Sequence, residues 1–139
     1  MDHVGVVVDD LAAATEFFVQ LGLEPQGEGS VEGRWVDRIV GLEGVRVDFA
    51  FVQTPDGHGQ LELIKFRSPP AEGDNRQVPA NTLGLRHLAF AVDDIDAVVA
   101  GLRACGAELG DVENYEDIYR LCYVRGPEGI IVELAERIG

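Results

Sequence analysis

Two histidines and two glutamates stand at matching points of the sequence and have the chemistry to hold a metal ion. They form two pairs, His3 with Glu62 and His87 with Glu133. Neutral imidazoles and carboxylates together make a mixed nitrogen and oxygen ligand set that suits a divalent transition metal, and four such ligands leave room for water on a five- or six-coordinate ion. Any of these residues alone would be unremarkable at a protein surface. Their repetition as pairs predicts one shared metal site.

An internal repeat places the two pairs at equivalent positions. Residues 3–11 (HVGVVVDDL) resemble residues 87–95 (HLAFAVDDI) at an offset of 84 positions. Residues 55–63 (PDGHGQLEL) resemble residues 127–134 (PEGIIVEL), with the two glutamates at an offset of 71 positions. The two offsets, 84 and 71, differ by 13, so we expect 13 extra residues in the first half between residues 27 and 55.

Each half of the repeat predicts a strand, a helix and three further strands. Aspartates follow the first strand, where their carboxylates can accept unpaired N–H groups at the start of a helix. Apolar residues then recur at helical spacing up to Gly22 and Gly106, which predict left-handed helix ends. The expected helices are 11–21 and 95–105. The expected strands are 4–8, 23–27, 45–52 and 61–66, then 88–92, 107–112, 120–124 and 130–134, with 35–40 as an optional additional strand.

Strand alternation predicts where the four side chains point. His3 shares a face with Gly5 and Val7, and His87 shares a face with two alanines, so each histidine has small neighbours and space for a ligand. Glu133 lies in the middle of an apolar strand, where a buried carboxylate needs a cation, a strong donor or water as its partner. The pattern predicts an α+β protein of two tandem βαβββ modules, residues 1–67 and 84–139, joined by a linker at 68–83.

Composition and charge exclude several classes of partner. The 139 residues carry 11 basic and 25 acidic side chains, a net charge of −14. This acidity argues against a nucleic-acid-binding face and against attachment to an anionic membrane. There is no apolar run of about 18 residues that would span a membrane, and the N-terminus lacks a secretory pattern. With only Cys105 and Cys122, the chain is expected to be cytoplasmic with reduced thiols.

The chain resembles the vicinal oxygen chelate superfamily, which includes glyoxalase I, methylmalonyl-CoA epimerase, extradiol dioxygenases and the bleomycin and fosfomycin resistance proteins. The resemblance rests on residues 3–11, 61–63, 86–94 and 126–134 and spans nearly the whole chain. It implies a single domain, residues 1–139, whose modules form a cupped mixed sheet around one divalent metal ion, Ni, Co, Mn, Zn or Fe. The ligands would be His3, Glu62, His87 and Glu133. It also implies a homodimer, with the site completed within one chain or across the dimer.

The same resemblance implies a lyase or isomerase that acts on a small oxygenated substrate. Two histidines and two glutamates resemble bacterial glyoxalase I most closely, whereas the nearly equal halves and the 25-residue step from Glu62 to His87 are more similar to the epimerases. In such chemistry the metal stabilises an enolate or enediolate. Glu133 would be the base that moves the proton, with Glu62 as a second base. The alternatives are a metal-independent ligand-binding or drug-sequestering protein and an Fe(II) extradiol dioxygenase.

Further side chains are weaker candidates for the site. Five cations could bind a carboxylate or phosphate of the substrate, or simply pair with surface acids: Arg34, Arg38, Lys65, Arg120 and Arg125. Tyr115 and Tyr119 could line a pocket, whereas core packing is expected for Trp35. His58 lies in a turn sequence and is expected to face solvent. Both cysteines are expected to be small apolar core residues rather than nucleophiles.

Overall fold

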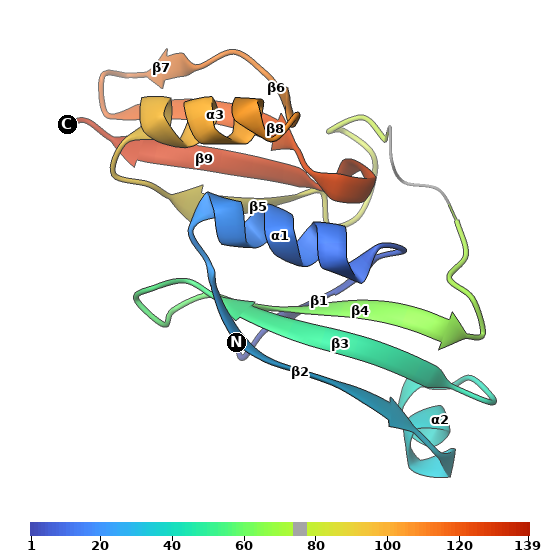
Figure 1. Ribbon diagram of the computed structural model, residues 1–139. Helices are drawn as coiled ribbons and strands as arrows, with labels where there is room; N and C mark the ends of the chain where they lie inside the picture. The colour runs from blue at the N-terminus through green and yellow to red at the C-terminus, as the bar shows by residue number, and fades with distance from the viewer. Residues whose placement is uncertain (74–77) are drawn as a thin grey trace. The chain divides into compact units, whose positions relative to one another are not determined.

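The computed structural model describes residues 1–73 and 78–139 and divides the chain into two compact units, Met1–Gly73 and Asp74–Gly139. Each unit contains one β-sheet with a helix packed on it (Figure 1). The linker expected at 68–83 spans this division, and its residues 74–77 lie outside the described part of the chain. Among the described residues, no helix has the length and apolar character needed to cross a membrane.

The first unit has the predicted order of strand, helix and three strands. Its elements are β1 (Val4–Val7), α1 (Leu11–Leu21), β2 (Glu24–Glu32), a short helix α2 (Arg34–Val40), β3 (Arg46–Gln53) and β4 (Gln60–Ser68). The four strands are ordered β1-β4-β3-β2, with β1 parallel to β4 and the other neighbours antiparallel.

The second unit repeats this arrangement. Its elements are β5 (His87–Ala91), α3 (Ile95–Ala104), β6 (Glu108–Leu109), β7 (Glu113–Tyr115), β8 (Tyr119–Arg125), a single 3-10 turn (Pro127–Gly129) and β9 (Ile131–Arg137). The strands are ordered β5-β9-β8-β6, with β7 also paired to β8, and β5 is parallel to β9. The predicted α+β class with two βαβββ modules is therefore confirmed, with one hydrogen-bonded sheet in each module.

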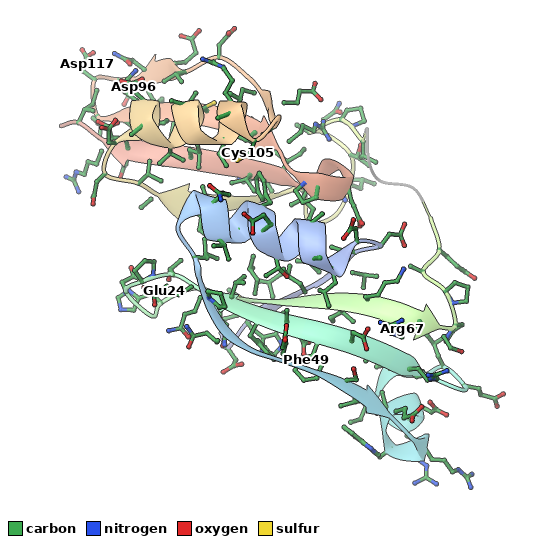
Figure 2. All side chains as sticks on the ribbon, viewed as in Figure 1. Glu24, Phe49, Arg67, Asp96, Cys105 and Asp117 are labelled. Carbon is green, nitrogen blue, oxygen red and sulfur yellow. The ribbon has the colours of Figure 1, made fainter. Side chains whose placement is uncertain are left out.

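Helix α1 spans the predicted residues, and α3 begins where the sequence predicts and ends one residue earlier. The carboxylate of Asp10 accepts a hydrogen bond from the backbone N–H of Ala13 at 3.0 Å, which fixes the first turn of α1. Asp94 accepts from the N–H of Ala97 at 3.1 Å and fixes the start of α3 in the same way. Helix α1 ends at Gly22, whose φ of 117° is readily adopted only by glycine. Figure 2 shows Asp96 near the start of α3 and Cys105 just past its end.

Two predicted strands are wrong. Residues 35–40 form the helix α2 rather than a strand, bounded by Gly33 and by Gly41 with φ of 77°. Only Val36 of this helix is buried, against Val45 and Val47. A short apolar run of this kind does not distinguish a strand from a helix by its periodicity. In the second unit, the strand expected at 107–112 is present only as the two residues of β6, and β7 follows beyond the expected range; each pairs with a different part of β8.

Each sheet has one face covered by its helix. In the first unit α1 packs on β3 and β4, and Phe18, Val52 and Leu63 are fully buried there. In the second unit α3 packs on β9 and β6, and the core contains Ile95, Leu102, Val132 and Leu134. A fully buried side chain of this size contributes about 2 kcal/mol from removal of apolar surface from water. The opposite face of each sheet, which we call the site face, carries the side chains that alternate with these core residues.

Candidate metal centre

In the first unit the strand register brings His3 and Glu62 together. Gly5 on β1 lies opposite Glu62 on the parallel neighbour β4, and His3 is two residues before Gly5, on the same face. The Nε2 atom of His3 lies 3.7 Å from Oε1 of Glu62. Its Nδ1 atom lies 2.7 Å from a carboxylate oxygen of Asp2. The two candidate ligands therefore lie side by side on the site face. The Asp2 carboxylate, on the opposite edge of the imidazole from Glu62, orients the His3 ring.

The second unit has the same arrangement. Ala89 on β5 lies opposite Glu133 on the parallel neighbour β9, and His87 is again two residues earlier. Nε2 of His87 lies 3.0 Å from Oε2 of Glu133, and Nδ1 lies 3.3 Å from the hydroxyl of Tyr123. Each sheet thus pairs its own histidine with its own glutamate in an identical register.

An aromatic side chain completes each pair. Phe51 lies opposite Glu62 on β3, and Tyr123 lies opposite Glu133 on β8. The ring centroids are 5.5 Å apart for His3 and Phe51 and 5.3 Å apart for His87 and Tyr123. Sequence reasoning missed both aromatics. They are related by an offset of 72 positions, which matches neither repeat offset, because the turn before the last strand is one residue shorter in the second half.

The hydrogen bond at Nδ1 of each histidine determines whether Nε2 of the same ring has a lone pair available to bind a metal ion. An ionised Asp2 only accepts hydrogen bonds, so it holds a proton on Nδ1 of His3 and leaves the Nε2 lone pair free when the ring is neutral. The Tyr123 hydroxyl can accept or donate, so it suits His87 with a proton on either nitrogen. In metal sites the second nitrogen of a ligating histidine almost always donates to a carboxylate, carbonyl or water. Both rings therefore fit metal binding through Nε2.

The surroundings of the pairs favour charged and coordinating groups. The side chains of Glu62 and Glu133 are 25% and 20% exposed, so each keeps limited contact with water. The pKa of His3 is raised above its usual 6.5, mainly by the hydrogen bond to Asp2. Burial opposes this increase, and the charges of Glu62 and Asp2 add smaller increases. In the part of the chain that is described, no group of three or more histidine, cysteine, aspartate or glutamate side chains is placed to hold a metal ion. Each unit contains one histidine–glutamate pair.

Only some of the other candidate residues lie on the site face. Arg120 lies on the helix-covered face and donates two hydrogen bonds, of 2.8 and 3.0 Å, to Asp96. Lys65 lies 3.9 Å from Asp9. Arg34 and Arg38 are exposed on α2, and Tyr115 is exposed on β7. Tyr119 and Arg125 alternate with the core residues of β8 and so belong to the site face.

Three further predictions concern burial. His58 lies in the turn before β4, and its side chain is 87% exposed, as predicted. The core packing expected for Trp35 is wrong, since this side chain is 57% exposed on α2, whose buried contact comes from Val36 instead. Cys122 is a buried core residue as predicted, whereas Cys105 is exposed because it follows the last turn of α3.

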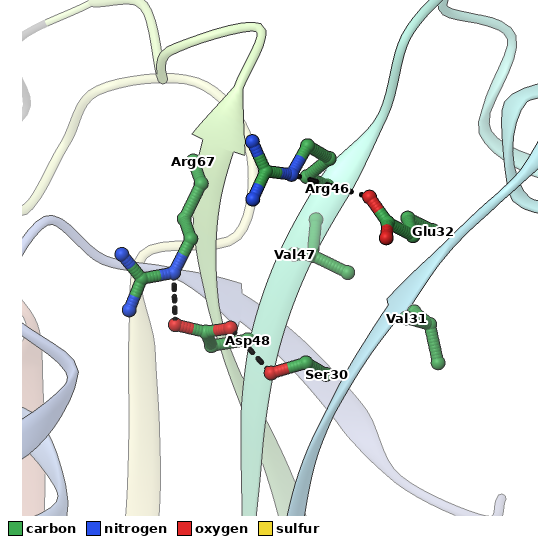
Figure 3. Close-up of a pocket in the computed structure, with 7 residues that line it drawn as sticks. All are labelled: Ser30, Val31, Glu32, Arg46, Val47, Asp48 and Arg67. Atoms are coloured by element: carbon green, nitrogen blue, oxygen red, sulfur yellow. Dashed lines mark hydrogen bonds and ion pairs between the residues drawn. The ribbon is translucent and has the colours of Figure 1, made fainter.

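A separate pocket of about 320 Å³ lies in the first unit, away from His3 and Glu62 (Figure 3). Its lining residues are Ser30, Val31, Glu32, Arg46, Val47, Asp48 and Arg67. Asp48 is paired with Arg67 and accepts a 2.6 Å hydrogen bond from Ser30, while Arg46 lies 3.2 Å from Glu32. Since each guanidinium has its own carboxylate, the pocket is close to electrically neutral.

Comparison with known proteins places the chain in a family. Residues 2–123 match the model of the glyoxalase/bleomycin resistance protein/dioxygenase superfamily. The uncharacterised protein YaeR of Escherichia coli is 32% identical, over 97% of this chain and 94% of its own length. The crystal structure of a glyoxalase family protein from Bacillus cereus is 47% identical, with a TM-score of 0.96, over 100% of this chain and 94% of that chain.

A more distant structure shares the fold alone. The fosfomycin resistance protein FosX of Listeria monocytogenes, crystallised with Mn(II) and a dihydroxypropylphosphonic acid, is 16% identical, with a TM-score of 0.63. The match covers 100% of this chain and 89% of that chain. The family model spans most of the sequence, and the two βαβββ modules agree with the B. cereus structure over the whole chain. The chain therefore belongs to the glyoxalase/bleomycin resistance protein/dioxygenase superfamily.

Proposed function

We propose that His3, Glu62, His87 and Glu133 hold one divalent metal ion in a lyase or isomerase that moves a proton on a small oxygenated substrate. The observation that carries this proposal is the identical register of the two pairs. In each unit the histidine lies two residues before the small residue that faces the glutamate. Two unrelated surface histidines would not need to share this relationship.

The donor set fits such an ion. Two imidazole Nε2 atoms and two carboxylates suit Ni, Co, Mn, Zn or Fe, and each ring has a partner at Nδ1 that orients it. FosX, which has the same fold, was crystallised with Mn(II). The proposal requires the pair of one unit to meet the pair of the other, either within one chain or between the two chains of a homodimer.

The proposed chemistry is proton transfer next to a chelated oxygen. A bound divalent ion would polarise the substrate oxygens and make the neighbouring C–H more acidic. The Glu133 carboxylate would take that proton, while the electron pair of the C–H bond moves toward the adjacent carbonyl, and would return the proton to the same or the next carbon. Glu62 would serve as the acid on the opposite face if the reaction inverts the carbon.

A metal-independent binding protein is the second candidate. The observation that favours it is the 3.0 Å distance between Nε2 of His87 and Glu133, because this contact satisfies both groups without an ion. The family to which the chain belongs also includes bleomycin resistance proteins. Metal content distinguishes the two candidates directly.

The first experiment is metal analysis of purified, dialysed protein by plasma mass spectrometry, before and after reconstitution with each of the five ions. We expect about one ion per chain and a clear loss in His87→Ala and Glu133→Gln. His58→Ala is the matched control, because this histidine is exposed in a turn and should leave metal content unchanged. No uptake of any ion would refute the metalloenzyme and favour the binding protein.

Activity is then tested with hemithioacetal and thioester substrates in deuterated water. Incorporation of deuterium at carbon would demonstrate proton abstraction. Bound iron with oxygen consumption would instead identify a dioxygenase. Mass measurement of the loaded protein in solution gives the number of chains that share each ion.

A further inference from the structure

Arg125 occupies a specific place on the site face of the second unit. It is the last residue of β8 and lies opposite Ile131, and Ile131 lies opposite His87. The next row of the sheet contains Tyr123, Glu133 and Ala89. Arg125 is therefore the diagonal neighbour of Glu133, at a typical separation of about 7–8 Å between the two residues, which long side chains can bridge.

The guanidinium of Arg125 is held by a neutral group. It is partly buried, and Nη1 donates to the backbone carbonyl of Gly129 at 3.3 Å. That carbonyl belongs to the turn between β8 and β9, where Glu128 and Gly129 have φ of 60° and 74°. The contact orients the side chain without neutralising its positive charge.

Three other arginines of the protein are paired with acids. Arg120 pairs with Asp96, Arg67 with Asp48 and Arg46 with Glu32. Within residues 1–73 and 78–139, no carboxylate lies at ion-pair distance from Arg125. The chain has 25 acidic side chains, so an unpaired and partly buried cation beside a candidate ligand pair is well placed to bind an external anion.

We propose that Arg125 binds the anionic end of the substrate, a small 2-hydroxy or 2-oxo compound with a second carboxylate or a phosphate a few bonds from its chelating oxygens. The inference rests on the proposed function, because the chelating oxygens need the metal site. The separation of Arg125 from Glu133 sets the length of the substrate at roughly three to five carbons. A guanidinium can grip either anion with two parallel hydrogen bonds.

The first unit has no cation at the equivalent position. The residue equivalent to Arg125 is Gln53, which lies opposite Gln60 just as Arg125 lies opposite Ile131. This position is neutral in the first unit. Arg137 also alternates onto the site face of the second unit, but it is exposed and four residues beyond Glu133, about 13 Å along the strand.

The test is calorimetric binding of three ligands to the metal-loaded protein. Glycerate, malate and 3-phosphoglycerate share a 2-hydroxycarboxylate that can chelate a metal, and they end in a hydroxyl, a carboxylate and a phosphate respectively. We expect malate or 3-phosphoglycerate to bind about 10- to 100-fold more tightly than glycerate, and the better of the two identifies the anion.

Arg125→Gln copies the residue of the first unit and should remove this preference while leaving glycerate binding and metal uptake unchanged. Arg103→Gln, an exposed site on α3, makes the same change of charge and should keep the preference. If Arg125→Gln does not fold, Arg125→Lys keeps the positive charge but cannot form the two parallel hydrogen bonds of a guanidinium. This variant should reduce the preference for malate or 3-phosphoglycerate over glycerate.

The outcomes separate this inference from the proposed function. Failure of the wild-type protein to take up metal refutes the proposed function. Normal metal uptake with equal binding of the three ligands, or with no binding of any, refutes the role of Arg125. A preference that survives in Arg125→Gln also refutes it.

Discussion

The hydroxyl of Tyr123 lies 3.3 Å from Nδ1 of His87, on the side of the ring away from Glu133. The equivalent position in the first unit is Phe51, which contacts His3 through its ring only. His3 has the Asp2 carboxylate at Nδ1 instead. The two halves of the candidate site therefore share their ligands but differ in the group that orients each histidine.

Replacing Tyr123 by phenylalanine should weaken metal binding about tenfold, the lower end of the usual effect of removing a group that orients a metal ligand. The phenyl ring keeps the packing against His87, so the loss isolates the hydroxyl. The measurement is metal affinity by competition with a chromophoric chelator. Tyr115→Phe, on the exposed strand β7, is the control, and an equal effect in both variants would contradict the prediction.

Replacing Asp2 by asparagine should lower the pKa of His3 toward its usual 6.5, because the hydrogen bond that His3 donates to the Asp2 carboxylate is the main cause of the raised value. A raised histidine pKa stabilises the fold below the unfolded value and loses that effect as pH rises through the folded pKa. The contribution of the Asp2–His3 hydrogen bond to the free energy of unfolding should therefore be present below pH 6.5 and lost as pH rises through the raised pKa of His3. Proton NMR titration of the metal-free protein measures the pKa, and a pKa of His3 unchanged by the substitution would refute this assignment.

Replacing Asp96 by asparagine should destabilise the protein at neutral pH. The hydrogen bonds from Arg120 hold the pKa of Asp96 below its usual 3.8. A depressed acid pKa gives stability that is present above the unfolded value and lost as pH falls through the folded one. Denaturant unfolding should show a lower midpoint at pH 7 and a smaller difference at about pH 3. Asp93→Asn, at an exposed position next to the helix cap, is the control and should leave the midpoint nearly unchanged.

The two cysteines should differ in reactivity. Cys105 is exposed, whereas Cys122 is 2% exposed and burial raises the pKa of its thiol. Because the thiolate is the reactive form, a disulfide reagent should modify one thiol in the native protein and the second only after unfolding. Cys105→Ser should abolish the fast phase. Fast modification that persists in this variant would show that Cys122 is accessible.

The sequence predicts those parts of the fold that depend on neighbouring residues. Asp10, Asp94 and Gly22 act within one helical turn, so the ends of α1 and the start of α3 are predicted correctly. The positions of Tyr123 and Asp2 depend on strand register and side-chain rotamers, which local patterns do not contain. Helix α2 lies in the insertion that has no counterpart in the second half. The internal repeat therefore could not predict whether this segment is a helix or a strand.

The parallel pairing of first and last strands has a consequence for folding kinetics. In each unit the histidine enters with the first strand, β1 or β5, and the glutamate with the last, β4 or β9. Contacts between distant segments require loop closure and dominate the slow part of folding. We therefore expect each pair to form late in the folding of its unit, and we expect ligands that bridge the pair to slow unfolding more than they speed folding.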